Sequence, residues 1–110
     1  MGLFGIGKKA YDQIGARELA SQWPIQGAVM IDVRTKGEFA SGHVQGAKHM
    51  DLMAGDFQNK LEALDKNATY YVMCRSGNRS GAAAGLMARM GFANVINVAG
   101  GIMSWPSKVV

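Results

Sequence analysis

The stretch that decides the fold is residues 69–80, which join a predicted strand to a cysteine-containing turn and a helix. It runs Thr69-Tyr70-Tyr71-Val72-Met73-Cys74-Arg75-Ser76-Gly77-Asn78-Arg79-Ser80. Its first five residues are β-branched, aromatic or apolar, which favours a strand. Beyond the polar turn, apolar residues from Ala82 to Met90 recur at helical spacing. Cys74 is therefore expected at the carboxyl end of a strand, just before a helix.

The alternation of strand and helix continues on both sides of this stretch. Further strands are predicted at 28–33 and 94–98, and helices at 16–22, 36–41 and 57–64, with a last short helix between Gly100 and Trp105. Thr35 and Glu38 have the spacing of a capping box, and Gly42 is placed to end that helix. Short apolar runs with β-branched residues are typical of parallel strands that are covered on both faces. The pattern predicts an α/β fold in which a small parallel sheet is flanked by helices on both faces.

Length and composition indicate one domain. The chain has 110 residues, of which 48% are hydrophobic and 18% charged, the balance of a globular protein. Residues 1–10 are expected to form a flexible lead-in and residues 11–110 the domain. The net charge of +4 comes from scattered residues and not from a basic stripe. We therefore do not expect nucleic-acid binding, and we expect a small anionic ligand instead.

Several features favour a cytoplasmic protein without a membrane segment. The single cysteine cannot form an internal disulfide, and residues 1–9 lack a signal-peptide pattern. No apolar run approaches the roughly 20 residues that a spanning helix needs. We expect the chain to act as a monomer without a cofactor.

The position of Cys74 favours a reactive thiol. The turn into a helix presents unpaired backbone N–H groups, and the helix dipole adds partial positive charge. Gly77 allows those amides to face inward as an anion nest, and Arg75 and Arg79 add two cations. Such surroundings lower the pKa of a thiol and stabilise an anion bound to it. The alternative, a plain buried cysteine, does not require this cluster of polar neighbours.

Three segments together resemble the rhodanese family. Cys74 to Ser80 resembles its active-site loop. Residues 31–34, 38–39 and 42–47 resemble its upstream signature, with Gln45 where proline is common, and residues 100–105 resemble its closing Gly-Gly-x-x-x-Trp element. The segments occur in the family's order and span residues 31–105.

The resemblance implies a rhodanese-like domain and a double-displacement reaction. Cys74 would take sulfur from thiosulfate as a persulfide and pass it to cyanide, a small thiol or a protein thiol. The family's catalytic cysteine maps onto Cys74. Its substrate-binding loop maps onto the six residues that follow: Arg75, Ser76, Gly77, Asn78, Arg79 and Ser80. A loop with two arginines is similar to that of thiosulfate-using members.

Three alternatives remain open at the level of sequence. Cysteine phosphatases and arsenate reductases share the Cys-loop-Arg logic, but they usually place five residues between Cys and Arg where this chain has four. A non-catalytic rhodanese-like module usually has a degraded loop, and this loop is intact. A sulfur relay to another protein would use the same chemistry at Cys74.

The remaining polar residues near these motifs are expected to have structural roles. Arg34 is predicted to pair with Glu38, and Asp32 to accept backbone hydrogen bonds. His43 is expected to hold its own turn, and zinc binding at His43 and His49 is not expected because no further ligands lie at suitable spacing.

Overall fold

The computed structural model describes residues 10–110, so the predicted flexible lead-in lies almost wholly outside the described residues. The strands are β1 (Asp12–Gly15), β2 (Ala28–Asp32), β3 (Lys48–His49), β4 (Thr69–Met73) and β5 (Asn94–Ala99). The helices are α1 (Ala16–Ala20), α2 (Lys36–Ser41), α3 (Phe57–Glu62), α4 (Asn78–Arg89) and the 3₁₀ helix η1 (Ile102–Ser104).

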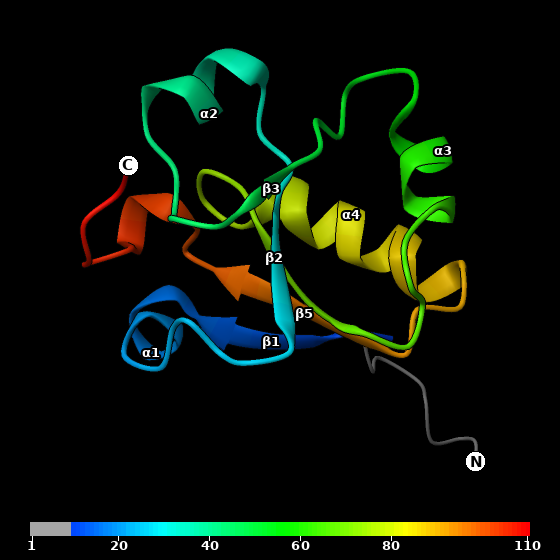
Figure 1. The fold of residues 1–110 in the computed structure, drawn as a ribbon, viewed down its shortest axis with the longest axis horizontal. Helices are drawn as coiled ribbons and strands as arrows, with labels where there is room; N and C mark the ends of the chain where they lie inside the picture. The colour runs from blue at the N-terminus through cyan, green and yellow to red at the C-terminus, as the bar shows by residue number, and fades with distance from the viewer. Residues whose placement is uncertain (1–9) are drawn as a thin grey trace.

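The five strands form one parallel sheet in the order β1-β5-β4-β2-β3. Figure 1 shows the arrowheads of β1 and β5 pointing the same way, toward the end of the sheet where η1 lies. β4 lies between β5 and β2, in the centre of the sheet. The residue after β4, Cys74, therefore leaves the sheet at the middle of its carboxyl edge, where ligands of parallel sheets bind.

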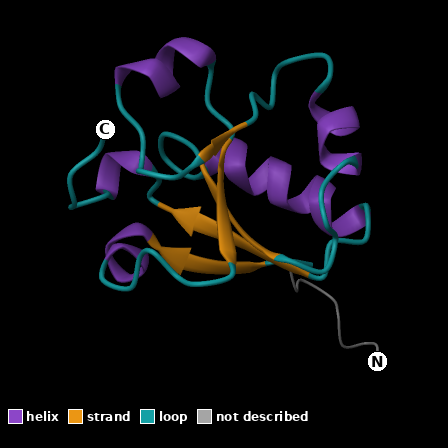
Figure 2. Cartoon of the chain, viewed as in Figure 1, coloured by secondary structure: helices purple, strands orange, loops and turns teal. Residues whose placement is uncertain are grey.

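Two apolar clusters cover the two faces of the sheet. One packs α3 and α4 against the strands through residues such as Leu61, Ala84 and Met87. The other packs α1 and the segment after η1 through Leu19 and Trp105. In the ribbon, α4 passes behind β2, and α1 lies well apart from it, beside the arrowheads of β1 and β5 (Figure 2). The predicted α/β fold with helices on both faces is confirmed.

The predicted cap of α2 is present. The Thr35 hydroxyl accepts from the Glu38 amide, and Glu38 Oε1 accepts from the Thr35 amide at 2.9 Å. Gly42 ends the helix with φ 151°, a conformation that favours glycine. Within residues 10–110, no helix combines the length and apolar character needed to cross a bilayer.

Two strands were not predicted, and one predicted ion pair is wrong. β1 and β3 are edge strands, and β3 has two residues, too few for a periodic signal. Arg34 pairs with Asp32 at 2.7 Å, and both side chains are buried. Arg34 contacts Glu38 through the backbone alone, where Nη1 donates a hydrogen bond to the Glu38 carbonyl. Asp32 is two residues away on the same strand end, which makes it the nearer partner.

Candidate functional site

Cys74 is a buried thiol with backbone amides directed at its sulfur. It is 1% exposed, and its Sγ accepts a hydrogen bond from the Gly77 amide at 3.0 Å. Burial, the largest single influence, raises the pKa of this thiol. The hydrogen bonds from the Ser80 hydroxyl and from the amides of Ser80, Gly77 and Ser76 outweigh burial, so the pKa of Cys74 lies below its usual value. The site thus favours a thiolate.

Gly77 gives the loop its shape. Its φ of 109° lies in the region that favours glycine, and it is the residue that precedes α4. A Cβ at this position would lie 3.3 Å from the Gly100 amide nitrogen. Both the turn and the close approach to the end of β5 therefore require the absence of a side chain.

The segment after β5 holds the loop from the other side. The Cys74 carbonyl accepts from the Ile102 amide at 2.9 Å, and the Arg75 carbonyl accepts from the Met103 amide at 3.1 Å. A Cβ at Gly101 would collide with the Arg75 carbonyl group. The Cys74 and Arg75 carbonyls thus point toward η1, and the amides of Ser76 and Gly77 face the sulfur. This contact explains why the Gly100-Gly101 pair accompanies the cysteine loop.

The two arginines of the loop have different surroundings. Arg75 is exposed, and within residues 10–110 its guanidinium makes no ion pair. Arg79 forms a two-point ion pair with Glu38 of α2, with Nη1–Oε1 at 2.7 Å and Nη2–Oε2 at 3.0 Å. The structure therefore does not leave both predicted cations equally free for an anion.

The Glu38 carboxylate has two structural roles, of which the capping-box pattern indicates one. It closes the capping box of α2 and also binds Arg79, which is 41 residues away in the chain. The hydrogen bonds from Arg79 and then from Thr35 lower the pKa of Glu38 to about 2. The sequence analysis assigned Glu38 to the capping box and to an ion pair with Arg34, so nothing there pointed to Arg79, its partner in the structure.

The other predicted loop residues divide by burial. Ser80 is fully buried on the first turn of α4, whereas Ser76 and Asn78 are exposed. The Ser80 hydroxyl donates to Asn97 Oδ1, and Asn97 is a site residue that sequence analysis missed. The available signal was a polar residue within the apolar run of β5.

The histidines have structural contacts. His43 Nδ1 lies 2.9 Å from the Phe39 carbonyl, as expected for a residue that holds its own turn. His49 Nε2 lies 2.8 Å from the Arg34 carbonyl. Among residues 10–110, no three His, Cys, Asp or Glu side chains gather into a cluster that would hold a metal ion.

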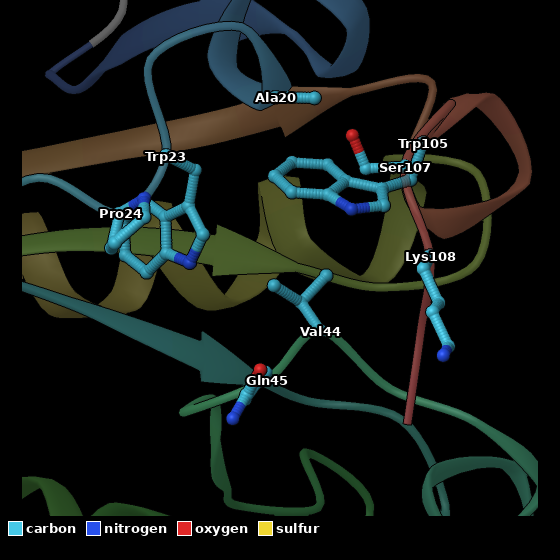
Figure 3. A pocket seen from close by; sticks show the side chains of 8 residues that line it. All are labelled: Ala20, Trp23, Pro24, Val44, Gln45, Trp105, Ser107 and Lys108. Atoms are coloured by element: carbon cyan, nitrogen blue, oxygen red, sulfur yellow. The ribbon is translucent and has the colours of Figure 1, made fainter.

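A pocket of about 240 Å³ lies elsewhere on the molecule (Figure 3). Its walls include Trp23, Pro24, Val44 and Trp105, with Lys108 at its edge. Val44 and Trp105 belong to the apolar cluster on the α1 face, whereas Cys74 belongs to the cluster on the α4 face. This pocket is separate from the Cys74 loop.

Comparisons with known proteins agree with this architecture. A family model described as the rhodanese-like domain matches residues 15–108. A thiosulfate sulfurtransferase, GlpE, from Pseudomonas fluorescens is 38% identical over 81 residues, covering 73% of this chain and 72% of that protein. A putative sulfur carrier protein, YrkF, from Bacillus subtilis is 37% identical over 79 residues, covering 72% of this chain and 42% of that longer protein.

A solved structure shows the same fold. The rhodanese-like domain protein from Staphylococcus aureus superposes with a TM-score of 0.79 at 27% identity, covering 90% of this chain and 96% of that one. The family model and the sequence relatives cover the loop that carries Cys74 and most of the sheet around it. This chain belongs to the rhodanese family.

Proposed function

We propose that this protein is a sulfurtransferase that carries sulfane sulfur as a persulfide on Cys74. The most direct support is the environment of the Cys74 sulfur. The sulfur accepts a hydrogen bond from the Gly77 amide at 3.0 Å, and the pKa of the thiol is lowered. A thiolate is the nucleophilic form of cysteine. The relatives named thiosulfate sulfurtransferase support the same class of activity.

The proposed donor is thiosulfate, and the first half-reaction is a nucleophilic displacement at sulfur. The Cys74 thiolate attacks the outer sulfur of thiosulfate, a Cys–S bond to that sulfur forms, and the bond to the sulfonate breaks. Sulfite leaves with the electron pair, and the negative charge of the persulfide lies on its outer sulfur. The amides of Ser76, Gly77 and Ser80, which face the Cys74 sulfur, would stabilise that charge. Arg75 supplies an exposed cation for the incoming dianion.

The second half-reaction returns the enzyme to its thiolate. A nucleophilic acceptor attacks the outer sulfur, the S–S bond breaks, and the electron pair stays on Cys74. Cyanide would yield thiocyanate, and a small thiol or a protein thiol would yield a new persulfide. We propose that the reaction needs no cofactor or metal, because the thiolate itself is the nucleophile in both steps.

We also propose a monomer comprising one rhodanese domain at residues 11–110 that works in the cytoplasm without nucleic-acid or membrane partners. The support for a reducing compartment is chemical, since Cys74 is the only cysteine and must return to the thiolate in every cycle. The scattered basic residues do not provide the continuous patch that nucleic acid requires.

The test is an intact mass of the purified protein after incubation with thiosulfate. We expect a gain of about 32 Da, the mass of one sulfur atom, that cyanide reverses with release of thiocyanate. Cys74→Ser is the matched control and should gain nothing. If neither thiosulfate nor a polysulfide produces an adduct, the proposed catalysis is wrong and the chain is a binding module on a rhodanese scaffold.

A further inference from the structure

Asn97 is a buried polar residue in the middle of β5. It is 4% exposed, and its register partners are Val72 on β4 and Gln13 on β1. Its strand neighbours Val95 and Val98 are buried and apolar. An asparagine at such a position costs free energy unless its amide is hydrogen-bonded. The hydrogen bonds of the Asn97 side-chain amide should therefore explain why this buried position of β5 holds asparagine and not an apolar residue.

The Asn97 amide connects the β-sheet to the Cys74 loop. Its Nδ2 donates to the Gly77 carbonyl at 3.3 Å and to Gln13 Oε1 at 3.2 Å. Its Oδ1 accepts from the Ser80 hydroxyl. Two of its three partners, Gly77 and Ser80, are among the residues that donate hydrogen bonds to Cys74 Sγ.

We propose that Asn97 is a positioning residue for the thiolate, and that its bond to the Gly77 carbonyl keeps the Gly77 amide directed at Cys74 Sγ. Gly77 lacks a Cβ, so its backbone has the widest conformational freedom in the loop. A bond to its carbonyl from β5, an interior strand of the sheet, restricts that freedom. The persulfide role of the thiolate rests on the proposed function, but the positioning of the thiolate does not.

The contact with Ser80 acts in a different way and must be separated from the contact with Gly77. A hydroxyl has one proton, and its position rotates to suit the neighbouring acceptors. The bonds of this hydroxyl to Asn97 Oδ1 and to the thiolate therefore compete for one proton, and loss of Asn97 would leave that proton to Sγ alone. This change opposes the effect of losing the Gly77 contact.

The experiment is therefore the substitution Asn97→Leu in two backgrounds, wild type and Ser80→Ala. The rate of Cys74 alkylation by iodoacetamide is measured across the pH range in which the thiol titrates. In the Ser80→Ala background, the bond to the Gly77 carbonyl is the one remaining contact between the Asn97 side chain and the cysteine loop, because the other partner of Nδ2 is Gln13 on β1. We expect the midpoint to move to higher pH and the rate at about pH 7 to fall by roughly three- to tenfold, as for loss of one hydrogen bond.

A matched control and a replacement variant complete the test. Asn94→Leu makes the same change at an exposed position of β5 and should leave the alkylation profile unchanged. Asn97→Ala replaces the leucine variant if the larger side chain prevents folding, as judged by circular dichroism and urea denaturation. Alkylation requires no sulfur donor, so the result does not depend on whether the protein transfers sulfur. A folded Asn97 variant with an unshifted profile in the Ser80→Ala background would overturn the proposal.

Discussion

At the scale of single residues, the two loop arginines show how position changes the task of one residue type. Both lie within five residues of Cys74. Arg79 is bound at two points by Glu38, whereas Arg75, the residue next to Cys74 in the chain, is exposed. An unpaired guanidinium attracts an approaching dianion more strongly than one already neutralised by a carboxylate. Donor recognition should therefore depend mainly on Arg75.

Replacing Arg75 should weaken the reaction with thiosulfate without changing the thiol. For Arg75→Ala we expect kcat/KM for thiosulfate to fall by roughly three- to tenfold, with a weaker dependence on salt. Alkylation by neutral iodoacetamide should keep its wild-type rate. Arg89→Ala removes the same charge at the far, exposed end of α4 and is the matched control. An equal loss in both variants would point to net charge and not to Arg75.

At the scale of elements, the Arg79–Glu38 pair fastens the start of α4 to α2. The pair is about one-third exposed at each side chain, so it is partly screened by solvent. Glu38 also caps α2 from within. A single carboxylate thus stabilises one short helix and joins it to the helix that carries the cysteine loop.

This carboxylate makes stability depend on pH in a defined window. The pKa of Glu38 is about 2 in the folded protein against 4.5 for the free group. Its stabilisation is therefore fully present above about pH 4.5 and is lost as pH falls toward about 2. We expect the free energy of unfolding of wild type to exceed that of Glu38→Gln near neutral pH, and the gap to close through this window.

Urea denaturation at about pH 7 and at about pH 3 measures that gap. Glu62→Gln removes the carboxylate of an exposed pair with Lys66 and should change stability little at either pH. A gap between wild type and Glu38→Gln that stays constant with pH would contradict the assignment.

Sequence reasoning predicted the elements that carry strong periodic signals. β4 matches its predicted range of 69–73, and the capping box of α2 is present as expected. β1 and β3 were missed because edge strands of four and two residues leave almost no pattern in the sequence. They form because neighbouring strands supply their hydrogen bonds, which is a property of the assembled sheet.

In the candidate site, too, contacts between residues close in the chain could be predicted from the sequence, and contacts between distant residues could not. The backbone cradle at Cys74 follows from local sequence, since a strand end, a glycine and a helix start are adjacent in the chain. The partners of Arg79 and Ser80 come from Glu38 and Asn97, which are distant in sequence. Glu38 was already explained by the capping box of α2, and Asn97 lies in a predicted strand. Their contacts with Arg79 and Ser80 are therefore visible only in the folded chain.

At the scale of the whole molecule, the contact between α2 and the start of α4 bears on whether the site suits phosphate or sulfur chemistry. A cysteine phosphatase needs a wide ring of amides and an arginine free to bind the phosphoryl oxygens. Here four residues separate Cys74 from Arg79, one fewer than usual in phosphate sites, and Arg79 is held by Glu38. Both features fit a single sulfur atom better than a tetrahedral oxyanion.

We therefore expect no turnover of an aryl phosphate such as p-nitrophenyl phosphate under conditions in which thiosulfate forms the Cys74 persulfide. Glu38→Gln offers a sharper version of the same test, because it weakens the hold on Arg79 without lengthening the loop. This variant should still be inactive on the phosphate, since the ring of amides keeps its size. Turnover by the wild-type protein that disappears in Cys74→Ser would show that loop length does not restrict the site to sulfur. Turnover by Glu38→Gln alone would instead identify the Arg79–Glu38 pair as the feature that excludes phosphate.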